Sequence, residues 1–148
     1  MKERIAKIRK KILNREVIAY VVAGVLTTAV DYVVFFLINE ALKGAGCDVT
    51  ESASVAQGVS WFSAVLFAFF VNRRYVFQST EKEPGKVFRE MISFFAARII
   101  SGLVVFALMW ILVDKGHMNE YIAKVLTSLF NLVFNYVASK LFIFRKKE

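Results

Sequence analysis

The chain has 148 residues, 57% of them hydrophobic, and a mean hydropathy of +0.53, which excludes an ordinary soluble domain because such domains are only about half apolar. The net charge of +8 would suit a nucleic-acid-binding protein, but the basic residues gather at the two ends and in one loop, beside long apolar runs. That placement is typical of membrane topology and predicts no nucleic-acid partner. A single cysteine and a single histidine exclude an internal disulfide and the usual His/Cys metal site.

Four apolar windows are long enough to cross a bilayer as helices, for which about 20 residues are needed. They cover residues 17–42, 53–71, 88–113 and 121–144. The windows are too long for strands of a membrane β-barrel and lack the alternation of such strands. We therefore predict an all-α membrane protein whose four transmembrane helices form two hairpins in one domain, 17–144. A basic segment, 1–16, precedes this domain, and a basic tail, 145–148, follows it.

Lysine and arginine are unevenly distributed among the segments outside these windows. They are concentrated in the first segment, the middle loop and the tail, whereas the other two loops hold only Lys43 and Lys115. By the positive-inside rule, both termini and the middle loop are predicted to be cytoplasmic. The basic first segment is expected to form a helix on anionic lipid.

Three charged residues fall inside the predicted spans: Asp31, Arg98 and Lys124. A charge at the centre of a membrane helix costs roughly 2.5 to 3.5 kcal/mol, so such residues are candidates for function. Asp31 and Arg98 are expected to pair, and one interpretation is that this pair only ties the first helix to the third. Lys124 lies near the outer end of its span, where the alternative is that its amine simply reaches water.

Polar and small residues recur at helical spacing on two of the spans and predict one polar face on each. On the fourth span this face comprises Lys124, Ser128, Asn131, Asn135 and Ser139, and on the second it comprises Ser60, Ala64, Ala68 and Asn72. Such faces either line a polar interior or provide close packing between helices.

The predicted interior carries one more positive than negative charge, and Arg73, Arg74 and Lys140 follow at its cytoplasmic mouth. This arrangement predicts an anionic ligand, because a phosphate accepts several charge-assisted hydrogen bonds and matches the guanidinium fork. Asn72 and Asn135 are expected to donate to the phosphate or to sugar hydroxyls. With one carboxylate and neither histidine nor cysteine in the interior, we predict no catalytic residue, no cofactor and no enzyme activity.

The two predicted hairpins share a weak internal similarity. A shift of 67 residues lays the segment 73–77 on 140–144 and Asp31 on Arg98. The alternatives are a duplication and chance, because membrane helices often end in basic and aromatic residues. The aromatic residues of these segments, including Phe77 and Phe144, are expected to anchor the interface. Alternatively they guide a lipid chain, and Phe94 is assigned to the same group.

Several of these residues together resemble the GtrA-like family: Gly24, Thr28, Asp31, the segment 70–77, Arg98, Asn135 and the segment 140–144. The resemblance extends from about Glu16 to Phe144 and is most specific in the Asn-Arg-x-aromatic-Val-Phe sequence that closes the second span.

The resemblance implies a role in glycosylating surface polysaccharides such as teichoic acid, from the cytoplasmic membrane of a prokaryote. Family membership implies translocation, or flipping, of a polyprenyl-monophosphate-linked sugar that a partner polyprenyl-phosphate glycosyltransferase makes on the inner leaflet. The alternative is a non-transporting membrane subunit that docks and stabilises this glycosyltransferase. The expected partners are the lipid-linked sugar, membrane lipid, the glycosyltransferase and, because four short helices enclose little volume, further copies in a homo-oligomer.

Overall fold

The computed structural model describes residues 2–144, with side chains described throughout except at 2–9, 11–13, 120, 121 and 124. The described chain is helical and contains no strand. Its α-helices are α1 (Lys2–Gly44), α2 (Val49–Val71), α3 (Pro84–Trp110) and α4 (Glu120–Ala138). Three π-helical turns extend these helices: η1 (Asn72–Val76), η2 (Ile111–Lys115) and η3 (Ser139–Ile143). Four segments are long and apolar enough to cross a membrane: Asn14–Gly44, Val49–Val76, Pro84–Lys115 and Val125–Ile143. The predicted fold class, an all-α protein with four transmembrane helices, is confirmed.

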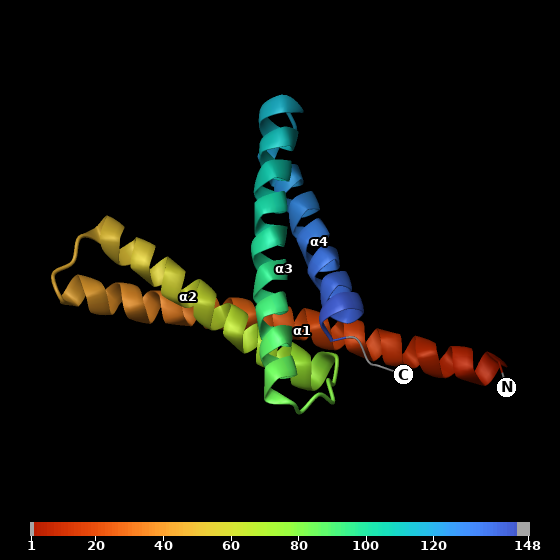
Figure 1. Ribbon diagram of the computed structural model, residues 1–148. Helices are drawn as coiled ribbons and strands as arrows, with labels where there is room; N and C mark the ends of the chain where they lie inside the picture. The colour runs from red at the N-terminus through yellow and green to blue at the C-terminus, as the bar shows by residue number, and fades with distance from the viewer. Residues whose placement is uncertain (1, 145–148) are drawn as a thin grey trace. The chain divides into compact units, whose positions relative to one another are not determined.

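The chain divides into two compact units, Met1–Gln78 and Ser79–Glu148. Each unit is a helical hairpin. In the first hairpin α2 turns back along α1 and ends in η1, and in the second α4 turns back along α3 and ends in η3 (Figure 1).

The helices begin earlier than the apolar windows do, for local chemical reasons. Helix α1 starts at Lys2 and runs without a break through the basic segment into the first span, since no glycine or proline interrupts the sequence before Gly24. Helix α2 starts at Val49 because the carboxylate of Asp48 accepts a hydrogen bond from the N–H of Thr50 at 3.0 Å. Helix α3 starts at Pro84, whose missing N–H costs nothing in the first turn. The tail predicted at 145–148 lies outside the described residues.

Both hairpins close in the same way. The N–H of Phe77 donates to the carbonyl of Asn72 at 2.9 Å, and the N–H of Phe144 donates to the carbonyl of Ser139 at 2.8 Å. Each bond closes a five-residue π turn. The first turn carries Arg73 and Arg74 and the second carries Lys140, so we call η1 and η3 the first and second basic turns. Such turns are rare and are often found at functional sites.

The shift of 67 residues also superposes part of the buried residues of the two hairpins. Five pairs of equivalent residues are buried in both hairpins: Ala56 and Ala123, Ser60 and Thr127, Ala68 and Asn135, Asn72 and Ser139, Phe77 and Phe144. Buried residues at helical spacing are expected in any packed hairpin, and other buried residues of the first hairpin, such as Val65 and Phe69, fall on residues that are not buried in the second. Duplication and chance therefore both stay open.

Large apolar side chains cover the outside of the hairpins. Among the most exposed are Leu103, Phe106, Val125 and Phe142, with exposed fractions of 66 to 80%. In water such surfaces would be an aggregation hazard, whereas hydrocarbon accommodates them. The outward residues therefore fit a lipid environment.

Candidate functional site

The first basic turn contains a buried amide with an unused acceptor. Asn72 is 1% exposed, and its Nδ2 donates to the carbonyl of Ala68 at 2.7 Å. Its Oδ1 is buried and has no hydrogen-bond partner among the described residues. Leaving a buried acceptor unpaired costs about 1 to 3 kcal/mol. The first hairpin therefore holds an unpaired acceptor next to Arg73, and an incoming donor reaches it only if the packing around Asn72 opens.

Two arginines follow Asn72 in the first basic turn. Arg73 is half-buried, whereas Arg74 is exposed and its Cζ lies 5.8 Å from the ring centroid of Tyr75. The turn closes on Phe77, which is buried and packs against Tyr20 of α1 with ring centroids 6.2 Å apart. This aromatic contact fixes the basic turn to the first helix of its own hairpin.

The second basic turn has the same plan with different polar groups. Ser139, which is 2% exposed, takes the place of Asn72, and Lys140 takes that of Arg73. The half-buried Lys140 donates from Nζ to the hydroxyl of Tyr136 at 3.1 Å. The turn closes on buried Phe144, whose ring centroid lies 6.0 Å from that of buried Phe94 in α3.

Arg98 lies one turn beyond Phe94 in α3, and its Cζ is 5.1 Å from the Phe94 ring centroid. The guanidinium has no carboxylate within ion-pair distance among the described side chains of its own hairpin. A cation–π contact offsets part of the cost of this charge, but it does not neutralise it. Arg98 is therefore a positive group inside a span, available to an anion.

Asp31 is the corresponding residue of the first hairpin. Its side chain is partly exposed, and Oδ1 is buried without a hydrogen-bond partner among the described residues. Asp31 and Arg98 belong to different units, so their pairing stays a prediction. The side chain of Lys124 lies outside the described residues, and its predicted role stays a prediction as well.

Asn135 is engaged within the second hairpin. Its Nδ2 donates to Oδ1 of Asn131 at 2.7 Å and to Oγ of Ser101 at 3.0 Å. The hydroxyl of Ser101 lies 3.3 Å from Oδ1 of Asn135 and donates to the carbonyl of Arg98 at 3.0 Å. These contacts tie α4 to α3 beside Arg98. A role of Asn135 in binding substrate requires this network to open.

The predicted polar face is right for α2 but shifted on α4. Ser60, Ala64, Ala68 and Asn72 are all buried. On α4, Asn135 and Ser139 are buried as expected, but Ser128 is exposed and Thr127, 1% exposed, takes its place. The prediction was wrong at Ser128 because the helical spacing was counted from Lys124. The true face begins at Ala123, which carries no polar signal.

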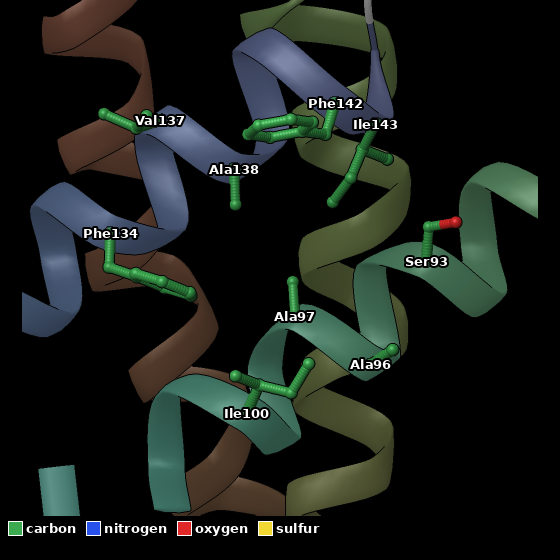
Figure 2. Close-up of a pocket in the computed structure, with 9 residues that line it drawn as sticks. All are labelled: Ser93, Ala96, Ala97, Ile100, Phe134, Val137, Ala138, Phe142 and Ile143. Carbon is green, nitrogen blue, oxygen red and sulfur yellow. The ribbon is translucent and has the colours of Figure 1, made fainter. Parts of the chain in front are cut away.

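A groove that the sequence pattern does not reveal lies between α3 and the end of α4 (Figure 2). Its volume is about 370 Å³, and its lining is apolar apart from one hydroxyl: Ser93, Ala96, Ala97, Ile100, Phe134, Val137, Ala138, Phe142 and Ile143. Figure 2 shows the methyl groups of Ala97 and Ala138 pointing toward one another across this space. The signal in the sequence is the set of small residues at helical spacing in α3, which is indistinguishable from ordinary helix packing.

Comparison with known proteins places this chain in a family context. The family described as "GtrA/DPMS, transmembrane domain" matches residues 19–144. The chain is 35% identical to the uncharacterized membrane protein YwcD of Bacillus subtilis over 129 residues, which cover 87% of this chain and 96% of that protein. It is 34% identical to the cell wall teichoic acid glycosylation protein GtcA of Listeria monocytogenes, and 33% identical to that of Listeria innocua. Each alignment spans 132 residues, or 89% of this chain and 86% of the relative.

Proposed function

The chain belongs to the GtrA/DPMS transmembrane domain family, and on this basis we propose that it flips a polyprenyl-monophosphate-linked sugar across the cytoplasmic membrane for surface glycosylation. It is a multi-pass membrane protein with four spanning helices. The family and the names of the Listeria relatives support a role in glycosylation. The proposal adds the substrate, a polyprenyl-monophosphate-linked sugar, and the step, its movement across the membrane.

The observation that carries the proposal is Arg98. This guanidinium lies within a spanning helix and is held over the ring of Phe94 without a carboxylate partner in its own hairpin, as far as its side chains are described. Ionisable groups at this depth are costly and mark substrate pathways. A monophosphate ester is an anion that guanidinium binds through two parallel hydrogen bonds.

The proposed path begins at the two basic turns. They end the second and the fourth spanning segments, and from the positive-inside rule we propose that both lie on the cytoplasmic side. Arg73 and Lys140 receive the lipid phosphate there. The unpaired Oδ1 of Asn72 accepts a hydrogen bond from a sugar hydroxyl.

Arg98 then takes the phosphate within the membrane, and Lys124 takes it near the outer face. Asp31 competes with the phosphate for Arg98, so that the anion is held weakly enough to leave. As in ion conduction, transport requires several sites that bind the substrate strongly enough for it to enter and weakly enough for it to leave. The sugar lipid comes from a partner polyprenyl-phosphate glycosyltransferase on the inner leaflet.

A second candidate function is a non-transporting subunit that docks and stabilises this glycosyltransferase. The observation in its favour is the network of Ser101, Asn131 and Asn135, in which polar groups hold two helices together instead of facing a substrate. Polar contacts of this kind are a normal device for joining membrane helices.

The experiment that separates the two functions changes Lys124 to Gln in cells and measures surface glycosylation together with protein abundance. Flipping through the proposed path requires Lys124, so glycosylation should fall sharply at normal abundance. The matched control is Lys115→Gln, since Lys115 is exposed near the same predicted side and contacts the ring of Trp110 at 5.3 Å. Normal glycosylation in a stably expressed Lys124→Gln protein would favour the docking subunit.

A further inference from the structure

We propose that the groove between α3 and α4 is the site that holds the polyprenyl chain of the lipid carrier, next to the second basic turn. The proposal rests on the function proposed above and adds the binding site of the chain. The site accommodates the first isoprene units after the phosphate, and the rest of the chain lies in the bilayer.

The lining of the groove matches a methyl-branched chain. Ala97 of α3 and Ala138 of α4 face one another across it, and the larger Phe134, Phe142 and Ile100 lie around them (Figure 2). Methyl branches at regular intervals fit the spaces that alanines leave between larger side chains. A volume of about 370 Å³ is small but within the range of about 300–1,000 Å³ for ligand sites, so it suits part of a chain.

Charge selects the kind of amphiphile. Phe142 and Ile143 line the groove from the same turn that carries Lys140. A cation therefore lies two residues along the chain from the groove lining, which favours a lipid with one anionic head and one chain over an uncharged lipid.

The internal similarity of the two hairpins supplies a further argument. At the equivalent positions of the first hairpin, larger residues replace three small ones of the groove: Leu26 stands for Ser93, Val30 for Ala97 and Val71 for Ala138. The common framework therefore does not require small residues here. At these three positions the small residues are specific to the second hairpin, where they line the groove.

The test is photolabelling of the full-length protein in nanodiscs with a diazirine-bearing polyprenyl phosphate that carries no sugar. Labelled residues are mapped by mass spectrometry. Labelling is expected in the groove, around Ala97 and Phe142. Ala97→Phe fills the groove and should reduce this labelling about tenfold, which corresponds to about 1.4 kcal/mol of binding free energy.

The matched control is Ala107→Phe, the same change at an exposed position of α3 outside the groove, which should leave labelling unchanged. If Ala97→Phe fails to fold, Ala138→Leu fills the same space from α4. Unchanged labelling in a folded groove variant would overturn the proposal. Equal labelling by a diazirine phosphatidylglycerol would show that the groove is an ordinary lipid-facing surface. Loss of labelling because a second copy of the protein covers the groove would show an oligomer contact. Either result also overturns the proposal.

Because this assay measures binding without sugar or transport, its outcome is separable from the proposed function. Groove labelling in a protein that does not flip would support the site and reject the transport. Flipping by a protein whose groove is not labelled would support the transport and reject the site.

Discussion

Ser101 and Asn135 join the two helices of the second hairpin through a hydrogen bond. Nδ2 of Asn135 donates to Oγ of Ser101 at 3.0 Å, and that hydroxyl lies 3.3 Å from Oδ1 of Asn135. Both residues are 2% exposed. The contact places the polar part of α4 beside Arg98 and holds it there.

Breaking this contact should loosen the second hairpin. Ser101→Ala and Asn135→Ala should each lower the free energy of unfolding, and the Ser101–Asn135 coupling energy should be about 0.6 to 1.7 kcal/mol, as for polar contacts between other membrane helices. The measurement is a double-mutant cycle on the purified protein in detergent. Ser128→Ala, at an exposed position of α4, is the control and should have almost no effect. A coupling energy of zero would contradict the role assigned to the contact.

The predicted topology can be tested at the single cysteine. Cys47 is exposed in the connection between α1 and α2, which the positive-inside rule places outside the cell. A membrane-impermeant thiol reagent should therefore label Cys47 in intact cells. The control is Thr80→Cys in a Cys47→Ser background, since Thr80 is exposed in the loop before α3 and should react only after permeabilisation. The opposite pattern would reverse the orientation.

Asp31 and Arg98 are predicted to be coupled although they belong to different hairpins. Removing one partner of a buried pair typically costs roughly 3 to 5 kcal/mol, so Asp31→Asn and Arg98→Gln should each lower the yield of folded protein. The double variant should recover part of this loss. Folded yield is measured by fluorescence-detected size exclusion. Strictly additive losses would show that the two side chains do not meet.

Asn72 is predicted to contribute more to ligand binding than to the stability of the fold. Its one hydrogen bond, to the carbonyl of Ala68, is offset by a buried oxygen without a partner, so Asn72→Leu should change stability by less than about 1 kcal/mol. Binding of a short-chain prenyl-phosphate sugar should weaken about tenfold, because the leucine cannot accept a hydrogen bond. Both quantities are measured on the same purified sample. Unchanged binding would remove Asn72 from the site.

The sequence predicted the four spans because an apolar run of spanning length has few alternatives in lipid. It did not give the helix starts, since Asp48 caps α2 and Pro84 opens α3 outside the apolar windows. It missed the π turns, because their bonds from residue i to i+5 leave no compositional trace. It could not find the groove, since Ala97 and Ala138 read equally well as tight packing. Spacing alone favoured Ser128 over Thr127, and only the packed hairpin shows which of the two is buried.

The most direct test of the central claim is transport by the purified protein alone. The protein is reconstituted into liposomes without glycosyltransferase, a short-chain polyprenyl-phosphate sugar is supplied on one side, and its appearance on the other side is followed with time. We expect transport well above that of empty liposomes, a strong reduction in Arg98→Lys because a point charge replaces the guanidinium fork, and no change in Lys115→Gln. Transport no faster than in empty liposomes, from folded protein that still binds the glycosyltransferase, would contradict the account.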